Sequence, residues 1–217
     1  MSERLTKDSI IKALLDAAFS RSTGATSLAN VADALHIKKA SLYNHFNSRE
    51  DLIFQTTNSC AEYIREISFI PNDFESVTKK YPPETVLKGL VTRYVKMHEK
   101  SPLFQIYTFV ESQKYFNPEA AKISTEQKEK LISQTEKILI SLSSLGKIKI
   151  PGSLIHGTAV WFCSGVNDIL DKHLLKRKQV VMANPQTGEG ELFSIDPDEK
   201  SIEAINALVE EFSLLIK

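Results

Sequence analysis

The 217-residue sequence contains only two cysteines, Cys60 and Cys163, which lie far apart and match neither a disulfide framework nor a zinc motif. We therefore expect a reducing, cytoplasmic setting and no bound metal or cofactor. No run of about 18 consecutive apolar residues occurs, so a membrane span is not expected. The first residues are charged and follow a helical pattern instead of the unbroken apolar core of a signal peptide, so export is not expected either.

An excess of one sign of charge is also missing, because 27 basic residues balance 27 acidic residues. The chain as a whole therefore does not show the positive charge that many nucleic-acid-binding domains carry. Charge has to be judged locally: residues 1–50 hold seven basic and five acidic side chains, a net charge of +2. An excess this small assists DNA binding only if it is concentrated on one face.

Glycine is scarce, with eight residues, and apolar side chains recur at helical spacing along most of the chain. This pattern predicts an all-α protein. Helices are expected over residues 7–21, 28–35, 39–46, 49–67, 84–100, 102–116, 118–145, 151–178 and 196–216. Residues 71–83 are predicted to be an irregular linker. Residues 180–182 and 192–195 flank a turn-rich segment, and the region 180–195 forms either a small β-hairpin or a loop.

The first three predicted helices have the layout of a helix-turn-helix unit. Apolar residues of the second helix fall at i, i+3, i+4 and i+7 and make one face: Leu28, Val31, Ala32 and Leu35. His36 and Ile37 make a tight turn between this helix and the third. Side chains that can accept a free backbone N–H are available as N-caps: Thr6 for the first helix, Thr26 or Ser27 for the second, and Ser48 for the fourth. Helices joined by so short a turn are typical of DNA-binding domains.

The third predicted helix, residues 39–46, carries polar side chains of five chemical kinds. Leu42 and Phe46 lie one turn apart and are expected to face inward. The remaining positions place a cation, a hydroxyl, a phenol, an amide and an imidazole outward: Lys39, Ser41, Tyr43, Asn44 and His45. Such groups form hydrogen bonds with base edges and phosphates. For this segment taken alone, a solvated helix face without a DNA role is the alternative.

Residues 26–53, TSLANVADALHIKKASLYNHFNSREDLI, strongly resemble the signature of the TetR family of transcriptional regulators. That signature has a capping Thr, an apolar helix ending in Ala-x-x-x-Gly-Val, then Ser-x-x-x-Leu-Tyr-x-x-Phe, then a capped Lys/Arg-Glu-x-Leu. The matching features here are Thr26, Val31-Ala32, Ile37, Leu42-Tyr43, Phe46 and Arg49 to Leu52. The resemblance covers roughly residues 7–55. The rest of the chain agrees with the family only in length and helical architecture.

The resemblance implies a bacterial repressor that binds a double-stranded DNA operator as a homodimer and is not an enzyme. Its third helix would enter the major groove, and Tyr43 would contact phosphate together with the start of the second helix. The expected domains are residues 1–50 for DNA binding, 51–70 as a connecting helix, and 71–217 for effector binding and dimerisation. Contacts to DNA are expected from Thr26, Ser27, Lys38, Lys39, Ser41, Tyr43, Asn44, His45 and Arg49.

Three residues depart from the family pattern. His36 stands where Gly is usual, and a left-handed conformation costs more without Gly, although His is among the residues that tolerate it. Lys38 replaces a capping Ser or Thr, so it cannot accept a backbone N–H but can offer a cation to phosphate. Ala29 replaces a frequent Arg, which removes one phosphate contact. These departures leave the fold intact but make the operator sequence unpredictable.

The C-terminal half shows no catalytic signature. His156 and Cys163 share a predicted helix, but a separation of about 10 Å is too long for a nucleophile and its base. The other histidines show no metal-ligand spacing. We expect instead a pocket for a small apolar or aromatic effector, lined by large apolar side chains and a few polar ones: Met97, His98, Phe104, Tyr107, Glu111, Trp161, Phe162 and Asn167. Ordinary core packing is the alternative for these aromatic residues.

Small residues on the predicted helix 151–178 permit close approach of another helix: Gly157, Ala159, Ser164 and Gly165. With the last amphipathic helix they resemble the two-helix dimer surface of the family, and packing within one chain is the alternative. The sequence thus favours a ligand-responsive repressor. A DNA-bound architectural regulator of the same fold without a ligand and an unrelated helical enzyme are the competing hypotheses.

Overall fold

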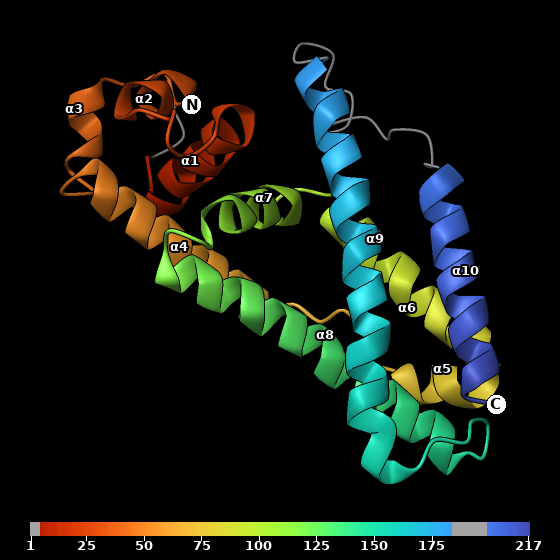
Figure 1. Ribbon diagram of the computed structural model, residues 1–217. Coiled ribbons are helices and arrows are strands. Elements are labelled where there is room, and N and C mark those ends of the chain that lie inside the picture. The colour runs from red at the N-terminus through yellow and green to blue at the C-terminus, as the bar shows by residue number, and fades with distance from the viewer. Residues whose placement is uncertain (1–4, 184–198) are drawn as a thin grey trace. The chain divides into compact units, whose positions relative to one another are not determined.

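The structure is a computed structural model that describes residues 5–183 and 199–217, and every regular element in these ranges is helical (Figure 1). The predicted all-α fold class is therefore confirmed. The chain divides into two compact units: Met1–Ile67 with Pro102–Thr125, and Ser68–Ser101 with Glu126–Lys217. The first division lies close to the boundary expected near residue 70, but the segment 102–125 joins the N-terminal unit.

The N-terminal unit is built around its first helix, α1 (Lys7–Arg21), which contacts three of the others. The unit also contains α2 (Leu28–Ala34), α3 (Lys39–Leu42), α4 (Arg49–Glu66), α7 (Leu103–Gln113) and the start of α8 (Pro118–Ser144). α1 packs against α2, α4 and α7. Phe19 of α1 meets Phe104 of α7 edge to face, with ring centroids 4.8 Å apart. This apolar contact with α1 is the reason that α7 belongs to the N-terminal unit.

Side-chain caps begin three helices of this unit, α1, α2 and α4, as expected. The Thr6 hydroxyl accepts the backbone N–H of Ser9, and the Ser48 hydroxyl accepts that of Asp51. Of the two candidates before α2, Ser27 is the cap, and its hydroxyl accepts the N–H of Asn30. Each such cap contributes about 1 kcal/mol. The boundaries of α2 and α4 are therefore set by local hydrogen bonds.

In the described residues, the second unit is an assembly of four longer helices and two short ones. It contains α5 (Phe74–Lys80), α6 (Pro83–His98), the remainder of α8, the short 3₁₀ helix η1 (Gly152–Leu154), α9 (Ile155–Ala183) and α10 (Glu199–Leu215). α10 packs against both α6 and α9. The core of the second unit contains five fully buried side chains: Leu87, Tyr94, Phe162, Leu170 and Phe212.

Glycine at one position allows α10 to approach α9 closely. A Cβ atom on Gly165 would lie 2.8 Å from the Cδ1 atom of Leu208, which is inside normal contact distance. Ala159 is also fully buried. These two small residues therefore serve packing within the chain, the alternative considered for them, whereas Gly157 and Ser164 are exposed.

Three predicted boundaries are wrong. Residues 71–83 contain α5 instead of an irregular linker, α3 ends at Leu42 instead of residue 46, and α9 continues to Ala183. The run Val180–Met182 is therefore helical and does not form the first strand of a hairpin. Its β-branched residues favour a strand locally, but they continue a 29-residue helix. The remainder of the hairpin prediction, residues 184–195, lies outside the described residues.

α5 is held at its C-terminal end by a lysine from a distant part of the chain. The Lys147 ammonium donates to the backbone carbonyls of Thr78 at 2.6 Å, Lys79 at 2.7 Å and Tyr81 at 2.8 Å. The last carbonyls of a helix lack partners within the helix, and a cation there also complements the helix dipole. A seven-residue helix that is marginal alone thus becomes stable in this fold.

Candidate nucleic-acid interface and buried polar cluster

The turn between α2 and α3 is a Schellman motif with a histidine at its left-handed position. The N–H of His36 bonds to the carbonyl of Asp33 at 3.1 Å, and the N–H of Ile37 bonds to that of Ala32 at 3.0 Å. His36 has φ 54°, the left-handed conformation expected at this position. Glycine is the usual residue there, but two hydrogen bonds hold the turn in place. The turn directs the chain into α3 at Lys38, whose side chain makes no cap hydrogen bond.

The exposed side of the α3 segment carries polar groups, and its other side is buried. Leu42 and Phe46 are buried, as predicted. Tyr43 is 51% exposed, which is unusual for a large aromatic side chain. The predicted contact residues differ in exposure: Lys38, Lys39, Tyr43 and Asn44 are exposed, whereas Ser41 and His45 are half-buried.

Asn44 and His45 lie after α3 and not within it. The N–H of Tyr43 bonds to the carbonyl of Ala40 at 3.3 Å, and the N–H of His45 bonds to that of Leu42 at 2.9 Å. These bonds span three residues instead of the four of an α-helix, so the segment tightens into turns after Leu42. The helix predicted over residues 39–46 is therefore a short helix followed by a helical turn.

A shallow hollow of about 500 Å³ lies beside α3, between the starts of α2 and α4. Ser27 and Ser48, the N-caps of those helices, line it together with Lys39 and Tyr43. Helix starts carry free N–H groups and a partial positive charge, and both features favour anions. With a lysine and a phenol beside them, they make this hollow chemically suited to a phosphate.

Two predicted contact residues have internal partners instead. Thr26 is only 1% exposed, and its hydroxyl donates to the carbonyl of Ser22 at 2.8 Å. This burial does not fit the predicted DNA contact. The Arg49 guanidinium donates through Nε to the carbonyl of Thr26 at 2.8 Å and through Nη2 to that of Thr23. Arg49 therefore ties the start of α4 to the loop that precedes α2.

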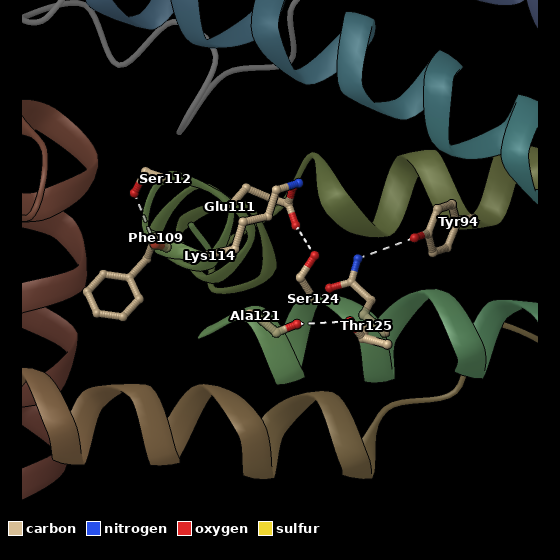
Figure 2. Close-up of polar contacts among 9 residues, drawn as sticks. Tyr94, Phe109, Glu111, Ser112, Lys114, Ala121, Ser124 and Thr125 are labelled. Carbon is tan, nitrogen blue, oxygen red and sulfur yellow. Dashed lines mark hydrogen bonds and ion pairs between the residues drawn. The ribbon is translucent and has the colours of Figure 1, made fainter. Parts of the chain in front are cut away.

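Three of the predicted effector residues lie on α7 in the N-terminal unit. Phe104 and Tyr107 are buried, and Phe104 packs on Phe19. The Glu111 carboxylate accepts hydrogen bonds from Lys114 at 2.6 Å and from the Ser124 hydroxyl at 2.5 Å (Figure 2). Glu111 thus joins α7 to α8 and already has two partners in the chain.

In the second unit, His98 and Asn167 belong to one buried polar cluster that also includes Tyr94 and Gln127. His98 Nδ1 lies 2.8 Å from the carbonyl of Tyr94, which can only accept, so Nδ1 carries the proton. His98 Nε2 then accepts from the Gln127 amide at 3.0 Å. The same amide donates to the Tyr94 hydroxyl at 3.2 Å, which donates to Asn167 at 3.2 Å. Figure 2 shows Tyr94 with its amide partner.

Burial keeps the imidazole of this cluster neutral. His98 is fully buried, and desolvation lowers its pKa to about 4, although the hydrogen bond to the Tyr94 carbonyl opposes that shift. Tyr94 and Gln127 were not among the predicted site residues. Gln127 belongs to a set of polar residues, with Ser124 and Gln134, that α8 places on its buried face. Polar residues among the apolar positions of a long helix were the available sequence signal for Gln127.

The remaining predicted effector residues do not join this cluster through hydrogen bonds. Met97 is half-buried on α6. Phe162 is buried against Phe212, with ring centroids 4.4 Å apart. Trp161 is 54% exposed and lies at 5.7 Å from the same Phe212 ring. Phe162 therefore belongs to the α9–α10 core, and Trp161 lies at the surface of α9.

Both cysteines of the chain are buried, Cys60 in the N-terminal unit and Cys163 in the second unit. Burial raises the pKa of Cys60 to about 12 and that of Cys163 to about 11, so both thiols stay protonated. Cys163 donates to the Thr135 hydroxyl, and His156 pairs with Glu136. No group of three or more potential metal ligands occurs in residues 5–183 and 199–217. None of the helices in those ranges is both long and apolar enough to cross a bilayer.

Comparison with known proteins gives one match by sequence and many by structure. Residues 10–56 match the sequence model of the family "Bacterial regulatory proteins, tetR family". No match is found among curated protein sequences. A TetR-family transcriptional regulator from Mesorhizobium loti is similar in structure, with 19% identity, a TM-score of 0.60, and 97% of this chain and 96% of that chain covered.

Two further solved structures are similar over nearly their whole length. A TetR transcription regulator from Haloarcula marismortui has 11% identity and a TM-score of 0.60, with 97% of each chain covered. AibR in complex with isovaleryl coenzyme A and operator DNA has 15% identity and a TM-score of 0.53, with 94% of this chain and 96% of that chain covered. Residues 10–56 therefore match the sequence model of the tetR family of bacterial regulatory proteins, and the chain as a whole has the fold seen in these solved TetR-family transcriptional regulators.

Proposed function

We propose that this protein is a transcriptional repressor that binds operator DNA as a homodimer and is released by a small effector. The observation that carries the proposal is the α2–turn–α3 surface. It combines a rigid Schellman turn, an exposed Tyr43 and the exposed cations Lys38 and Lys39 beside a hollow suited to phosphate. The family match over residues 10–56 supports the same function.

Each exposed group of this surface can be given a role. Tyr43 and Lys38 contact phosphates, with the start of α2 at Ser27, because such contacts fix the register of a protein on DNA. Lys39 and Asn44 contact base edges, where lysine pairs with guanine and asparagine with adenine. Ser41 and His45 are half-buried and make secondary contacts. Arg49 and Thr26 hold the unit together instead of touching DNA.

Selection of the purified protein on random double-stranded DNA tests the function directly. We expect enrichment of a palindromic site whose half-sites are about one helical turn apart or somewhat more, since two-fold dimers read two major grooves. Affinity for that site should fall steeply with salt as counterions are displaced. Recovery of no sequence preference, together with weak binding that salt does not change, would contradict the proposal.

Asn44→Ala and Lys38→Ala are expected to weaken DNA binding in different ways. Loss of a bidentate base contact by Asn44 costs about 1–3 kcal/mol on the selected site and relaxes discrimination at one base position. Loss of a phosphate contact by Lys38 weakens all sequences alike and flattens the salt dependence. Affinities of both variants for selected and random DNA across a salt series separate the roles. Equal losses of Asn44→Ala on both DNAs would assign Asn44 to the backbone.

Dimerisation through α9 and α10 is supported by an apolar seam along α9. Exposed large apolar residues occupy three positions of α9 in a series with a period of seven, in which Asp168 takes the remaining position: Trp161, Leu175 and Met182. Leu154, at the end of η1 just before α9, continues the series. Residues seven apart lie about two turns apart on the same side of a helix, so these side chains form one apolar stripe on which a second helix can pack. Asp168 is paired with Lys172 at 2.7 Å. On α10, Leu214 and Leu215 are also exposed.

Leu175→Asp is expected to convert the dimer to a monomer. The side chain is 63% exposed in the single chain and, in the proposed dimer, two copies of the charge would be buried without partners. The dissociation constant should rise roughly a hundredfold or more, measured by light scattering over a concentration series. Phe54→Asp is the matched control, because Phe54 is 59% exposed on α4, which belongs to the other compact unit. If the control variant is a monomer and Leu175→Asp remains a dimer, the interface lies elsewhere.

Effector release follows from the fold and from the buried cluster around His98. AibR was solved with both isovaleryl coenzyme A and operator DNA, which supports a ligand-responsive role for the same fold. The effector proposed is a small apolar or aromatic molecule whose polar group replaces one hydrogen bond of the Tyr94–Gln127–His98–Asn167 cluster. It releases DNA only if it binds better to the form with wrongly spaced α3 segments. A thermal-shift screen followed by operator release for each hit tests this part.

A further inference from the structure

A second feature of the C-terminal unit, separate from the His98 cluster, is a groove of about 280 Å³ between α6, α9 and α10. Its apolar surface comes from Val95 of α6 and from Ile202 and Ile205 of α10. The groove shares no residue with the Tyr94–Gln127–His98–Asn167 cluster. Ligand sites are typically concave and mostly apolar with a few polar groups, and this groove has that character.

Three of the lining residues form a hydrogen-bonded chain that joins the three helices. His173 of α9 lies 2.7 Å from Glu99 of α6 through Nε2 and 3.1 Å from the Ser201 hydroxyl of α10 through Nδ1. Burial would raise the pKa of Glu99, but its hydrogen bond to His173 and the charges of His173, Arg177 and Lys96 outweigh burial and lower it. The one carboxylate among the groove's lining residues is therefore ionised and already has a hydrogen-bond partner in His173.

The other polar groups of the groove form a row along α6. Lys88, Thr92 and Lys96 follow at intervals of four residues, which places them on one face of the helix. Both lysines are exposed, and neither forms an ion pair within the described part of the chain. Opposite them, Asn206 of α10 lines the groove, and its buried Oδ1 has no hydrogen-bond partner among the described residues.

The chemistry of these lining groups indicates the kind of ligand that would fit: an amide oxygen without a partner, two exposed ammonium groups and an apolar floor. The amide can present either its oxygen or its NH₂ group to a ligand, because the two ends exchange by rotation. Ammonium groups attract an anion, and the isoleucines and valine take up an alkyl chain. A groove of about 280 Å³ has room for an alkyl chain of moderate length but not for a bulky cofactor.

We propose that this groove binds a medium-chain carboxylate. The carboxylate lies beside Thr92 and Asn206, flanked by Lys88 and Lys96, and the alkyl chain covers Val95, Ile202 and Ile205. The site recognises the charge by two exposed lysines and the chain by buried area, so neutral analogues bind more weakly and affinity rises with each methylene that the groove covers.

Direct binding of decanoate to the full-length protein, measured by calorimetry without DNA, tests the proposal independently of any regulatory function. The double variant Lys88→Gln/Lys96→Gln should bind decanoate roughly threefold to thirtyfold more weakly, the range expected for two solvent-exposed charge contacts. Decan-1-ol should bind the wild type more weakly than decanoate by a similar factor. Thr92→Phe fills the groove from its half-buried edge and should abolish binding.

Lys137→Gln is the control for charge, because Lys137 is an exposed lysine of α8 in the same unit that does not line the groove. It should bind decanoate like the wild type, and circular dichroism should show that every variant keeps its helices. The proposal is overturned if decanoate does not bind, if decanol binds equally well, or if Thr92→Phe and the double lysine variant retain wild-type affinity.

Discussion

Replacement of Arg49 by lysine is expected to weaken binding to the selected DNA site roughly tenfold to a hundredfold, nearly as much as replacement by methionine, although the positive charge remains. Arg49 donates from two nitrogens of one planar group to the carbonyls of Thr26 and Thr23. A lysine is a single point donor on a flexible stem and cannot reproduce this geometry. Hydrogen bonds to charged groups contribute about 1.5–3 kcal/mol.

The loss acts on DNA binding through the position of α2 and α3. The two carbonyls belong to the loop that leads into Ser27, the cap of α2, so release of this loop loosens the start of the DNA-binding surface. A direct phosphate contact behaves differently, because lysine serves that role well. If Arg49→Lys binds DNA with wild-type affinity while Arg49→Met binds it weakly, Arg49 contacts phosphate.

Three measurements make this comparison decisive. Affinity and its salt dependence are measured for wild type, Arg49→Lys and Arg49→Met, and thermal unfolding reports the loss of internal hydrogen bonds. Glu50→Gln is the matched control, since Glu50 is exposed, lines the same hollow and lies 3.9 Å from Arg49. We expect the control to unfold like the wild type and to bind DNA slightly better, because it removes a negative charge near phosphate.

Acidification is expected to destabilise the wild type more than a His98→Gln variant, with a difference of about 3 kcal/mol between pH 7 and pH 4. Desolvation lowers the pKa of His98 from 6.5 to about 4, so the folded protein resists protonation that the unfolded chain accepts. The stability that comes from the neutral imidazole is fully present above pH 6.5. It is lost progressively as the pH falls from 6.5 toward 4, because the unfolded state gains a proton first.

Urea unfolding at several pH values tests this expectation through the difference between the two proteins. His98→Gln lowers stability at pH 7 as well, so the slopes with pH are compared and not the absolute values. His156→Gln is the control, because His156 is an exposed histidine paired with Glu136. Its pH slope should follow that of the wild type. Parallel slopes for wild type and His98→Gln would show that His98 titrates normally in the folded protein.

Features that depend on neighbours in the chain were predictable from the sequence alone. Thr6, Ser27 and Ser48 cap their helices through backbone groups three residues away, and the left-handed His36 lies in a turn closed by bonds to Asp33 and Ala32. Leu42 and Phe46 face inward because residues one turn apart share a helix face. The family signature rests on the same local spacing, and it is confirmed over residues 10–56.

Features that depend on distant partners were decided by the tertiary structure. Lys147 stabilises α5 from 69 residues away, and the Gln127 amide meets Tyr94 and His98 across 33 and 29 residues. Arg49 has the charge and the hydrogen-bond donors expected of a DNA contact. Its guanidinium donates instead to the carbonyls of residues 23 and 26 positions earlier in the chain. A polar side chain has the same hydrogen-bonding capacity whether its partner is DNA, water or a buried carbonyl. Spacing along the chain therefore locates helices and their faces, whereas only packing decides which polar groups are left free to bind another molecule.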